Sequence, residues 1–249
     1  NIMYNITIKM FFKTSLVIIT ICFFYFNSYT QESDYFEYQN EVLWGINKNT
    51  NGGLIGGLNL KFGNKIKDNT YKVYGIELVN VKHPKEYKYT SPFGGDNFIW
   101  AKQNTMYSFR MQYGFEKSIF NKKDENGIQI NANLTGGPSL GFLVPYYIRY
   151  NRNNAVVVEA FDSNIHNFNN VIGSAGFLEG INEAKIRPGV NLKSAVNFEF
   201  GSMKKGSIAL EVGFLVEAFT KKMIIMPTVQ NKSIFTSAFI ALFYGRKWK

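Results

Sequence analysis

Apolar and polar residues alternate with a period of two along several long stretches of this chain. The clearest stretch covers residues 105–116, where large apolar side chains occupy every second position from Tyr107 to Phe115. Polar or small residues fill the positions between them. Successive side chains of an extended strand point to opposite faces, so the pattern predicts a β-strand with one apolar and one polar face.

The alternation recurs in eight segments. They cover residues 38–48, 53–65, 70–82, 105–116, 128–135, 190–200, 208–217 and 233–248. An even number of strands is what a single-chain bacterial barrel requires. The last segment is rich in strand-forming residues, but it does not show which of its faces is the outer one.

Short and long connections alternate between these segments. The short, polar connections are 65–69, 121–127 and 202–206, and the long ones are 83–103, 147–187 and 222–232. The exception is the connection at 49–52, which we expect to be a tight hairpin. Short turns at one end and long loops at the other are typical of outer-membrane barrels, in which the short turns are periplasmic.

A soluble barrel of the lipocalin kind shows the same alternation with its apolar face turned inward. About five large apolar residues per strand would overfill the interior of an eight-stranded barrel, which side chains only just fill. The opposite face, rich in Gly, Asn, Ala and charged residues, fits that interior. The sequence therefore predicts an all-β fold over residues 31–249, an eight-stranded antiparallel up-and-down transmembrane β-barrel.

Residues 1–30 have the three-part order of a secretory signal peptide. Lys13 supplies a positive charge, residues 15–26 form a mainly apolar run, and residues 28–30 suit a cleavage site. The run is too short to span a bilayer as a helix, which takes about 20 residues. We expect this leader to be removed and the barrel to be exported to the cell outer membrane. The single cysteine, Cys22, lies in the leader, so we expect no thiol chemistry in the mature chain.

The net charge of +10 would fall to +8 without the leader, which contains Lys9 and Lys13. Only five of the 28 basic residues are arginine, and several lysines occur as pairs in the expected turns. Nucleic-acid recognition favours arginine, so we expect no nucleic-acid partner. A basic surface facing anionic lipid is the better interpretation, which makes outer-membrane lipid and lipopolysaccharide the expected partners.

Charged residues also occur on the inward, polar face of the predicted strands. They are Glu41, Lys61, Glu77, Arg110, Glu116, Lys193, Glu199, Glu211 and Glu217. Buried charges persist only when they are paired, so these side chains predict an ionic network across the barrel interior that closes the lumen. The alternative is a narrow ion channel, or a carboxylate cluster whose acidic excess raises its proton affinity.

The run at 136–142 suits a bend in a strand, and the last segment ends in an aromatic-rich stretch from Phe243 to Trp248. With these features, residues 38–248 resemble the small outer-membrane barrels of the OmpA/OmpX type from Gram-negative bacteria. The resemblance implies insertion by the barrel assembly machinery, which in such proteins recognises an aromatic-rich terminal strand. One departure from the pattern is Lys249, which follows Trp248.

His83 and His166, the two histidines of the chain, are the candidates for catalysis. Small outer-membrane lipid A hydrolases use Ser/His arrangements, and His83 is close in sequence to Glu86 and Ser91. The spacing matches no established motif, so the simpler interpretation is a loop histidine, and a lipid-modifying hydrolase is the alternative.

A helix over 157–168 would place Glu159, Asp162 and His166 on one face, as in a zinc or hard-metal site. An isolated triple of this kind is usually a solvated loop face, so we expect neither a metal nor a cofactor.

Lys82, Lys85 and Lys88, interleaved with Tyr87 and Tyr89, lie at the start of the first long connection. At the outer leaflet these lysines would contact lipopolysaccharide phosphates, with the rings at the interface. The alternative is a set of lysines that snorkel at the interface without a specific ligand.

The 147–187 connection is long for a structureless loop, and loops of that length are usually functional or disordered. Its apolar run at 155–160 suggests a lid over the barrel mouth or a docking surface for a protein of an envelope complex. Extension of the neighbouring strands above the membrane is the alternative. We therefore expect a non-enzymatic outer-membrane protein that acts through its extracellular loops, by binding a partner or lipopolysaccharide or by maintaining envelope integrity.

Overall fold

The computed structural model describes residues 39–53, 56–94, 96–121, 127–176, 179–203 and 206–248. These residues all belong to one compact unit, Phe36–Lys249. The expected leader, residues 1–30, lies outside the described residues.

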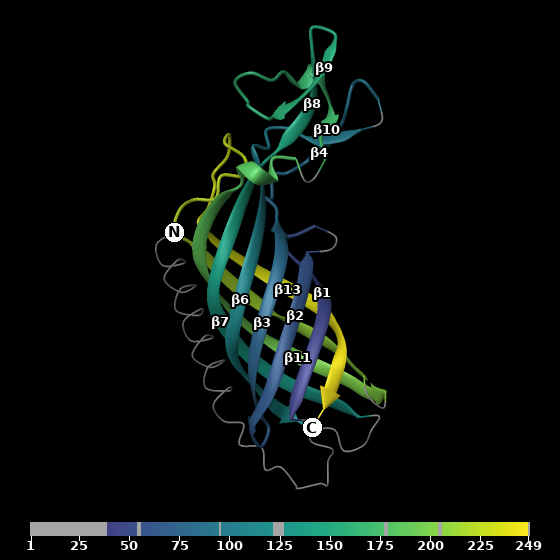
Figure 1. The fold of residues 1–249 in the computed structure, drawn as a ribbon, viewed down its shortest axis with the longest axis vertical. Coiled ribbons are helices and arrows are strands. Elements are labelled where there is room, and N and C mark those ends of the chain that lie inside the picture. Colours follow the sequence, from purple (N-terminus) through teal and green to yellow (C-terminus); the bar gives the residue numbers. More distant parts are fainter. Residues whose placement is uncertain are drawn as a thin grey trace, which may run out of the picture. The chain divides into compact units, whose positions relative to one another are not determined.

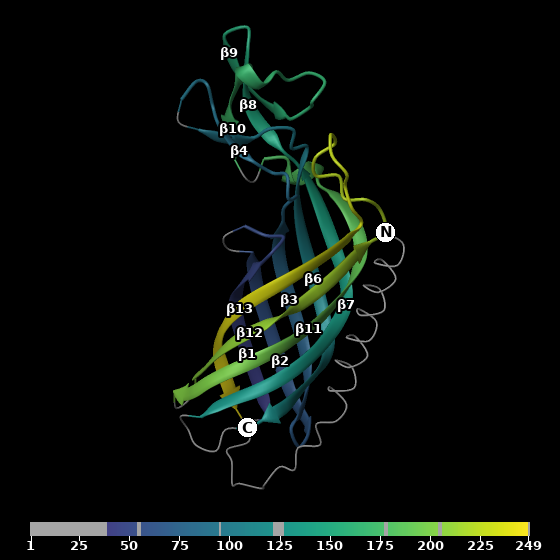
Figure 2. The ribbon, with the colours of Figure 1, turned by 180° about the vertical axis from the view of Figure 1, so that it is seen from behind.

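Eight long strands form a closed barrel, which can be followed by colour in Figures 1 and 2. They are β1 (Asn40–Asn49), β2 (Gly57–Lys67), β3 (Thr70–Val81), β6 (Asn104–Phe120), β7 (Ile128–Pro145), β11 (Lys185–Met203), β12 (Gly206–Phe219) and β13 (Ile234–Trp248). Each pairs antiparallel with the barrel strands before and after it, and β1 pairs with β13 to close the ring. The predicted eight-stranded antiparallel up-and-down barrel is confirmed. The shortest of these strands has 10 residues, which is enough to cross a bilayer core when tilted.

The two faces of each strand lie in different surroundings, as β6 illustrates. Met111, Tyr113 and Phe115 on its outer face are 42%, 46% and 49% exposed, whereas Gln112 and Glu116 on its inner face are buried. The alternation in the sequence therefore corresponds to an apolar exterior and a polar interior.

Strand β13 has aromatic residues on both faces. Phe239 and Phe243 point inward, and Ile240, Leu242 and Tyr244 are exposed on the outside. The inward pair belongs to an apolar cluster on one side of the lumen with Leu43, Ala195, Ala209, Leu215 and Ala241. The two inward phenylalanine rings of β13 fit into the lumen because the strands around them contribute small or aliphatic residues to the same cluster.

The connections differ in length at the two ends of the barrel. At the short-turn end, β2 and β3 are separated only by residues 68–69, and β11 and β12 by residues 204–205. At the other end, which we call the long-loop end, the connections cover residues 50–56, 82–103, 146–184 and 220–233. The chain does turn at 49–52, where the Gly52 amide donates to the Asn49 carbonyl at 3.2 Å, but the expected tight hairpin is wrong because the next strand begins only at Gly57.

Two of the long connections fold together, and we call residues 82–103 and 146–184 the loop assembly. It contains a hairpin of β4 (Lys88–Thr90) and β5 (Asn97–Ile99) and a sheet of β8 (Tyr147–Arg152), β9 (Ala155–Ala160) and β10 (Val171–Ser174). Two short 3-10 helices, η1 (Phe168–Asn170) and η2 (Ile181–Glu183), complete it. No helix in the described part of the chain is long and apolar enough to cross a bilayer.

The loop assembly has its own apolar core. Phe98, Ile148, Tyr150, Phe161 and Val171 are buried together, and Trp100 and Phe168 pack against them. The Ser91 hydroxyl also donates a hydrogen bond of 2.8 Å to the Val171 carbonyl oxygen, which joins the two connections. The 147–187 region is therefore a folded unit with its own sheet rather than a simple extension of β7 and β11.

Candidate functional site

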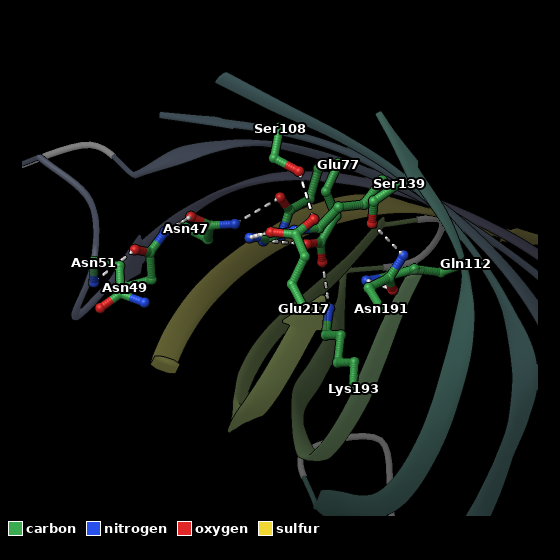
Figure 3. A network of polar contacts seen from close by, with 12 residues as sticks. Asn47, Asn49, Asn51, Glu77, Ser108, Gln112, Ser139, Asn191, Lys193 and Glu217 are labelled. Carbon is green, nitrogen blue, oxygen red and sulfur yellow. Dashed lines mark hydrogen bonds and ion pairs between the residues drawn. The ribbon is translucent and has the colours of Figure 1, made fainter. Parts of the chain in front are cut away.

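All nine charged side chains of the predicted network lie inside the barrel, and each is 5% exposed or less. They come from six different strands and point inward because each occupies a position of the polar face. Figure 3 shows part of this interior, where side chains from opposite walls meet.

Arg110 is at the centre of one cluster. Its guanidinium donates to both carboxylate oxygens of Glu217, with Nε–Oε1 3.1 Å and Nη2–Oε2 2.9 Å, and Nη1 is 3.4 Å from Glu77. The Ser108 hydroxyl donates to Glu217 as well, at 2.5 Å. The second partner of Glu77 is Lys193, whose Nζ is 2.6 Å away. A two-point contact between guanidinium and carboxylate fixes the orientation of both groups.

Glu211 connects this cluster to the next. Its carboxylate lies 2.7 Å from the Lys193 ammonium and 3.7 Å from that of Lys61, and it accepts a hydrogen bond from Asn133. Lys61 is also paired with Glu116. Seven of the nine interior charges, all except Glu41 and Glu199, therefore form a continuous chain of contacts and not a set of separate pairs.

Lys247 is a member of the interior network that the sequence analysis missed. Its ammonium pairs with Glu41 at 3.5 Å and with Glu199. It was missed because the sequence left the inner face of 233–248 undecided. The predicted set contained six glutamates and three cations, and this imbalance was a signal that a further cation was needed. With Lys247, each of the six glutamates lies within 3.7 Å of a cationic group.

The space left between these side chains is small. A cavity of about 10 Å³ lies among Asn59, Lys61, Glu77, Lys193 and Glu211. A cavity of that size holds about one water molecule. Inward-facing amides fill neighbouring positions, as where the Asn191 side chain donates 3.0 Å hydrogen bonds to the Ser139 hydroxyl and the Gly137 carbonyl.

His83, Glu86 and Ser91 do not form a catalytic arrangement. Glu86 accepts a hydrogen bond from the His83 backbone amide and binds Lys102 with its other oxygen, at 2.8 Å in both cases. The Ser91 hydroxyl is bonded to the Val171 carbonyl, as described above. Glu86 and Lys102 are a buried pair within the loop assembly, and burial lowers the pKa of the Lys102 ammonium while Glu86 opposes that shift.

Glu159, Asp162 and His166 are not on one face of a helix, so the helix considered for 157–168 is wrong. Glu159 belongs to β9, and the chain then turns at Asp162. His166 Nε2 nevertheless lies 3.1 Å from the Glu159 carboxylate, which also receives two hydrogen bonds from Arg152. The Asp162 side chain caps the Asn164 amide instead. Among the described residues, no cluster of three His, Cys, Asp or Glu side chains is suited to a metal ion.

The three lysines at the start of the loop assembly lie in different surroundings. Lys82 is half-buried, whereas Lys85 and Lys88 are exposed. Tyr87 is 64% exposed, and the Tyr89 ring packs edge-on against Phe168 at 5.4 Å. The structure thus presents two of the lysines and both tyrosine rings to the surroundings at the long-loop end, Tyr89 being 41% exposed.

The side chains on the outside of the barrel indicate the kind of environment that surrounds it. Its exposed side chains include large apolar residues from every strand, for example Trp44, Leu58, Ile76, Leu134 and Phe214. Water is a poor solvent for such a continuous apolar face, whereas the hydrocarbon of a bilayer is a suitable one. The chain is a transmembrane β-barrel.

Comparisons with known proteins found no matching protein-family model and no matching curated protein. Among solved structures, the barrel is similar to Ail, the attachment invasion locus protein of Yersinia pestis, which was crystallised in complex with the heparin analogue sucrose octasulfate. The sequence identity is 8% and the TM-score is 0.39, over 85% of this chain and 99% of that one. The assignment as a transmembrane barrel rests on the strand pairing and on the distribution of side chains described above.

Proposed function

We propose that this chain is an integral outer-membrane protein that works without catalysis, with the barrel as a closed anchor and the loop assembly as its binding part. The observation that carries the proposal is the loop assembly itself, which has its own sheet and its own buried core. Loops without a binding role have no need of such a core, and binding residues are often presented by loops on a rigid scaffold.

The paired interior supports a closed lumen. Every interior glutamate has a cationic partner, and the cavity of about 10 Å³ among them is too small for a water-filled path. The experiment is conductance of the purified, folded barrel in planar bilayers. We expect no stepwise conductance, and reproducible unit steps would favour the narrow ion channel instead.

Exposed residues of the loop assembly support a partner or lipid contact there. Val156 and Val158 are 63% and 52% exposed on β9, which is an edge strand of its sheet. An exposed apolar edge strand is a suitable contact for another protein. Lys85 and Lys88 offer positive charge to lipopolysaccharide phosphates at the same end.

A loop replacement tests this division of roles. In the variant, a short Gly-Asn turn replaces residues 146–184, and the matched control carries the same turn in place of residues 222–230. We expect both variants to remain in the outer membrane and to migrate differently in boiled and unboiled gel samples, as closed barrels do. Only the first should lose the proteins or lipids that co-purify with the wild type in mild detergent. Equal retention by both variants would contradict a binding role of the loop assembly.

The hydrolase alternative has its own test. His83 Nε2 lies 3.3 Å from the Gln230 carbonyl oxygen and His166 Nε2 lies 3.1 Å from the Glu159 carboxylate. Because neither ring is hydrogen-bonded to a serine hydroxyl in the described part of the chain, we expect the variant His83→Ala with His166→Gln to leave the lipid A profile of the membrane unchanged. A changed profile would favour the lipid-modifying enzyme.

A further inference from the structure

A pocket of about 390 Å³ lies at the long-loop end, between the barrel and the loop assembly. One wall is formed by Thr105 and Tyr107 at the start of β6 and by Val144 at the end of β7. The other wall comes from the β4–β5 hairpin and from the segment that follows β10. Pockets that bind small molecules are usually about 300–1,000 Å³.

The walls of the pocket are held in place by contacts within the fold. The Tyr146 hydroxyl accepts a hydrogen bond of 3.1 Å from the Ile99 amide, which fixes β5 against the end of β7. The Ala175 amide donates to the Tyr147 carbonyl at 2.9 Å. Burial raises the pKa of Tyr146, so this phenol stays protonated at neutral pH. The site is therefore built before any ligand arrives, which lowers the entropic cost of binding.

Several polar groups of the pocket are unused. Within the described part of the chain, no hydrogen bond is made by the hydroxyl groups of Thr105 and Tyr107 or by the side chains of Lys88 and Glu179. These groups offer hydroxyl donors and acceptors, a carboxylate acceptor and an ammonium donor. A ligand with many hydroxyl groups can satisfy all of them at once.

The charge of the pocket argues against a polyanion. Asp96 and Glu179 line it together with a single cation, Lys88, and the carboxylate of Asp96 is already paired with Arg149 outside the lining. The half-buried rings of Tyr107 and Tyr147 add apolar surface with a polar tip. A sugar ring combines one apolar C–H face with a rim of hydroxyls and thus matches both features.

We propose that this pocket binds a neutral saccharide, with the Glu179 carboxylate and the Tyr107 hydroxyl as hydrogen-bonding partners of its hydroxyl groups. The inference goes beyond the proposed function, because it names a ligand class for the loop assembly, and it rests on that function only in placing the pocket outside the cell. The saccharide can be the sugar part of a glycolipid in the same leaflet or a soluble glycan, since both present the same hydroxyl groups.

The test uses the full-length barrel purified in detergent and a panel of immobilised neutral oligosaccharides ending in hexose or N-acetylhexosamine. Two variants address the pocket: Glu179→Gln combined with Tyr107→Phe, and Gly176→Trp. Among the described residues, a Cβ at Gly176 would meet the Glu179 side chain at an ordinary contact distance of 3.7 Å, so a larger side chain can be introduced at this position of the pocket lining. The matched control is Tyr87→Phe, which removes the hydroxyl of an exposed ring in the same loop assembly that does not line the pocket.

We expect the wild type and Tyr87→Phe to bind the same neutral glycans. The double variant should bind about a hundredfold more weakly, because it alters two hydrogen-bonding groups and each lost hydrogen bond to a charged or well-placed group is worth about a factor of ten. Gly176→Trp should abolish binding. Neutral glycolipid in vesicles and the free oligosaccharide, tested separately, show which source is preferred.

Two results would overturn the proposal: no neutral glycan bound by the wild type, or unchanged binding by Gly176→Trp. The shift between boiled and unboiled gel samples, measured on every variant, separates loss of the barrel from loss of the pocket. If the barrel forms and the loop replacement loses its partners while the wild type binds no neutral glycan, the pocket proposal is wrong and the proposed function stands.

Discussion

The Arg110 guanidinium, on β6, reaches across the barrel interior to the Glu217 carboxylate on β12 and holds both of its oxygens, at 3.1 and 2.9 Å. Two strands, β7 and β11, lie between them in the ring. The contact therefore joins β6 and β12, two strands of the barrel that share no backbone hydrogen bonds. Interior pairs of this kind hold the closed barrel in one arrangement, and they make the cost of losing one partner high.

Removal of the Arg110 charge should destabilise the barrel strongly. Arg110→Met leaves Glu217 without its cation and weakens the pairing of Glu77, so we expect a loss of about 3–5 kcal/mol in the free energy of unfolding. Urea unfolding in detergent, followed by tryptophan fluorescence, measures it. The matched control is Lys48→Met, which removes an exposed, outward cation. Equal stability of the two variants would show that the interior pairing has no stabilising effect.

A side chain at Gly245 should disturb the closure of the barrel. A Cβ there would clash with the Val42 carbonyl oxygen on the neighbouring strand, so β13 and β1 could not keep their present register. We expect Gly245→Ala to cost about 1–3 kcal/mol and to lower the temperature at which the barrel unfolds on gels. Gly176→Ala serves as control, since among the described residues a Cβ there meets the Glu179 side chain at an ordinary contact distance of 3.7 Å. A thermal shift no larger than that of the control would rule out the close approach.

The pair of Lys102 and Glu86 should make stability depend on alkaline pH. Because burial lowers the pKa of folded Lys102 below the value of about 10.4 in the unfolded chain, the folded state binds fewer protons in that range. The loss of stability caused by burying the charge is therefore greatest at neutral pH. It disappears as the pH rises from the pKa of Lys102 in the folded state towards its pKa in the unfolded chain. The nearby groups are Glu86, Lys82 and the Tyr146 ring.

The measurement for Lys102 is the difference in unfolding free energy between the wild type and the variant Lys102→Met with Glu86→Gln, from pH 7 to pH 11. We expect the unfolding free energy of the wild type to increase relative to that of the variant as the pH rises. A constant difference would mean that Lys102 titrates alike in both states.

His166 should act as a packing residue of the loop assembly. Its ring is 6% exposed and lies against Tyr150 at 4.7 Å and Phe161 at 5.6 Å. We expect His166→Ala to leave a cavity that costs the loop assembly about 2–4 kcal/mol and speeds its cleavage by protease, while the gel shift of the barrel is unchanged. His166→Phe should restore resistance in part. Resistance equal to the wild type in His166→Ala would contradict this role.

Lys85 and Lys88 should contribute to binding of anionic lipid. Each exposed lysine near an anionic surface is worth about 1 kcal/mol, so Lys85→Gln and Lys88→Gln should each weaken binding to lipopolysaccharide vesicles about fivefold. The effect should shrink as salt is added. Lys117→Gln, a change at the short-turn end, should have no effect, and an equal loss there would show that the attraction is not specific to this end.

The sequence was sufficient to predict the barrel because its signal is local. The face on which residues such as Met111 and Gln112 lie can be predicted from their immediate neighbours in the sequence, and this periodicity repeats in all eight strands. The connection lengths added the division into a short-turn and a long-loop end. The inward positions of the charged residues followed from the same alternation.

Which charges meet was decided only by the tertiary structure. Pairing of Glu77 with Arg110 follows from adjacent strands, but Arg110 with Glu217 depends on the curvature and register of the closed ring. Lys247 became an interior residue only when β13 paired with β1, because both faces of β13 carry apolar residues.

The fold of the loop assembly was likewise decided only by the tertiary structure. Its runs of alternating residues are short, and its core joins Phe98 to Val171 from two connections that are far apart in sequence. Local periodicity therefore determined the strands and, except in β13, their faces, whereas contacts between distant segments, which depend on ring closure and side-chain packing, decided the interior pairs, the loop assembly and the pocket.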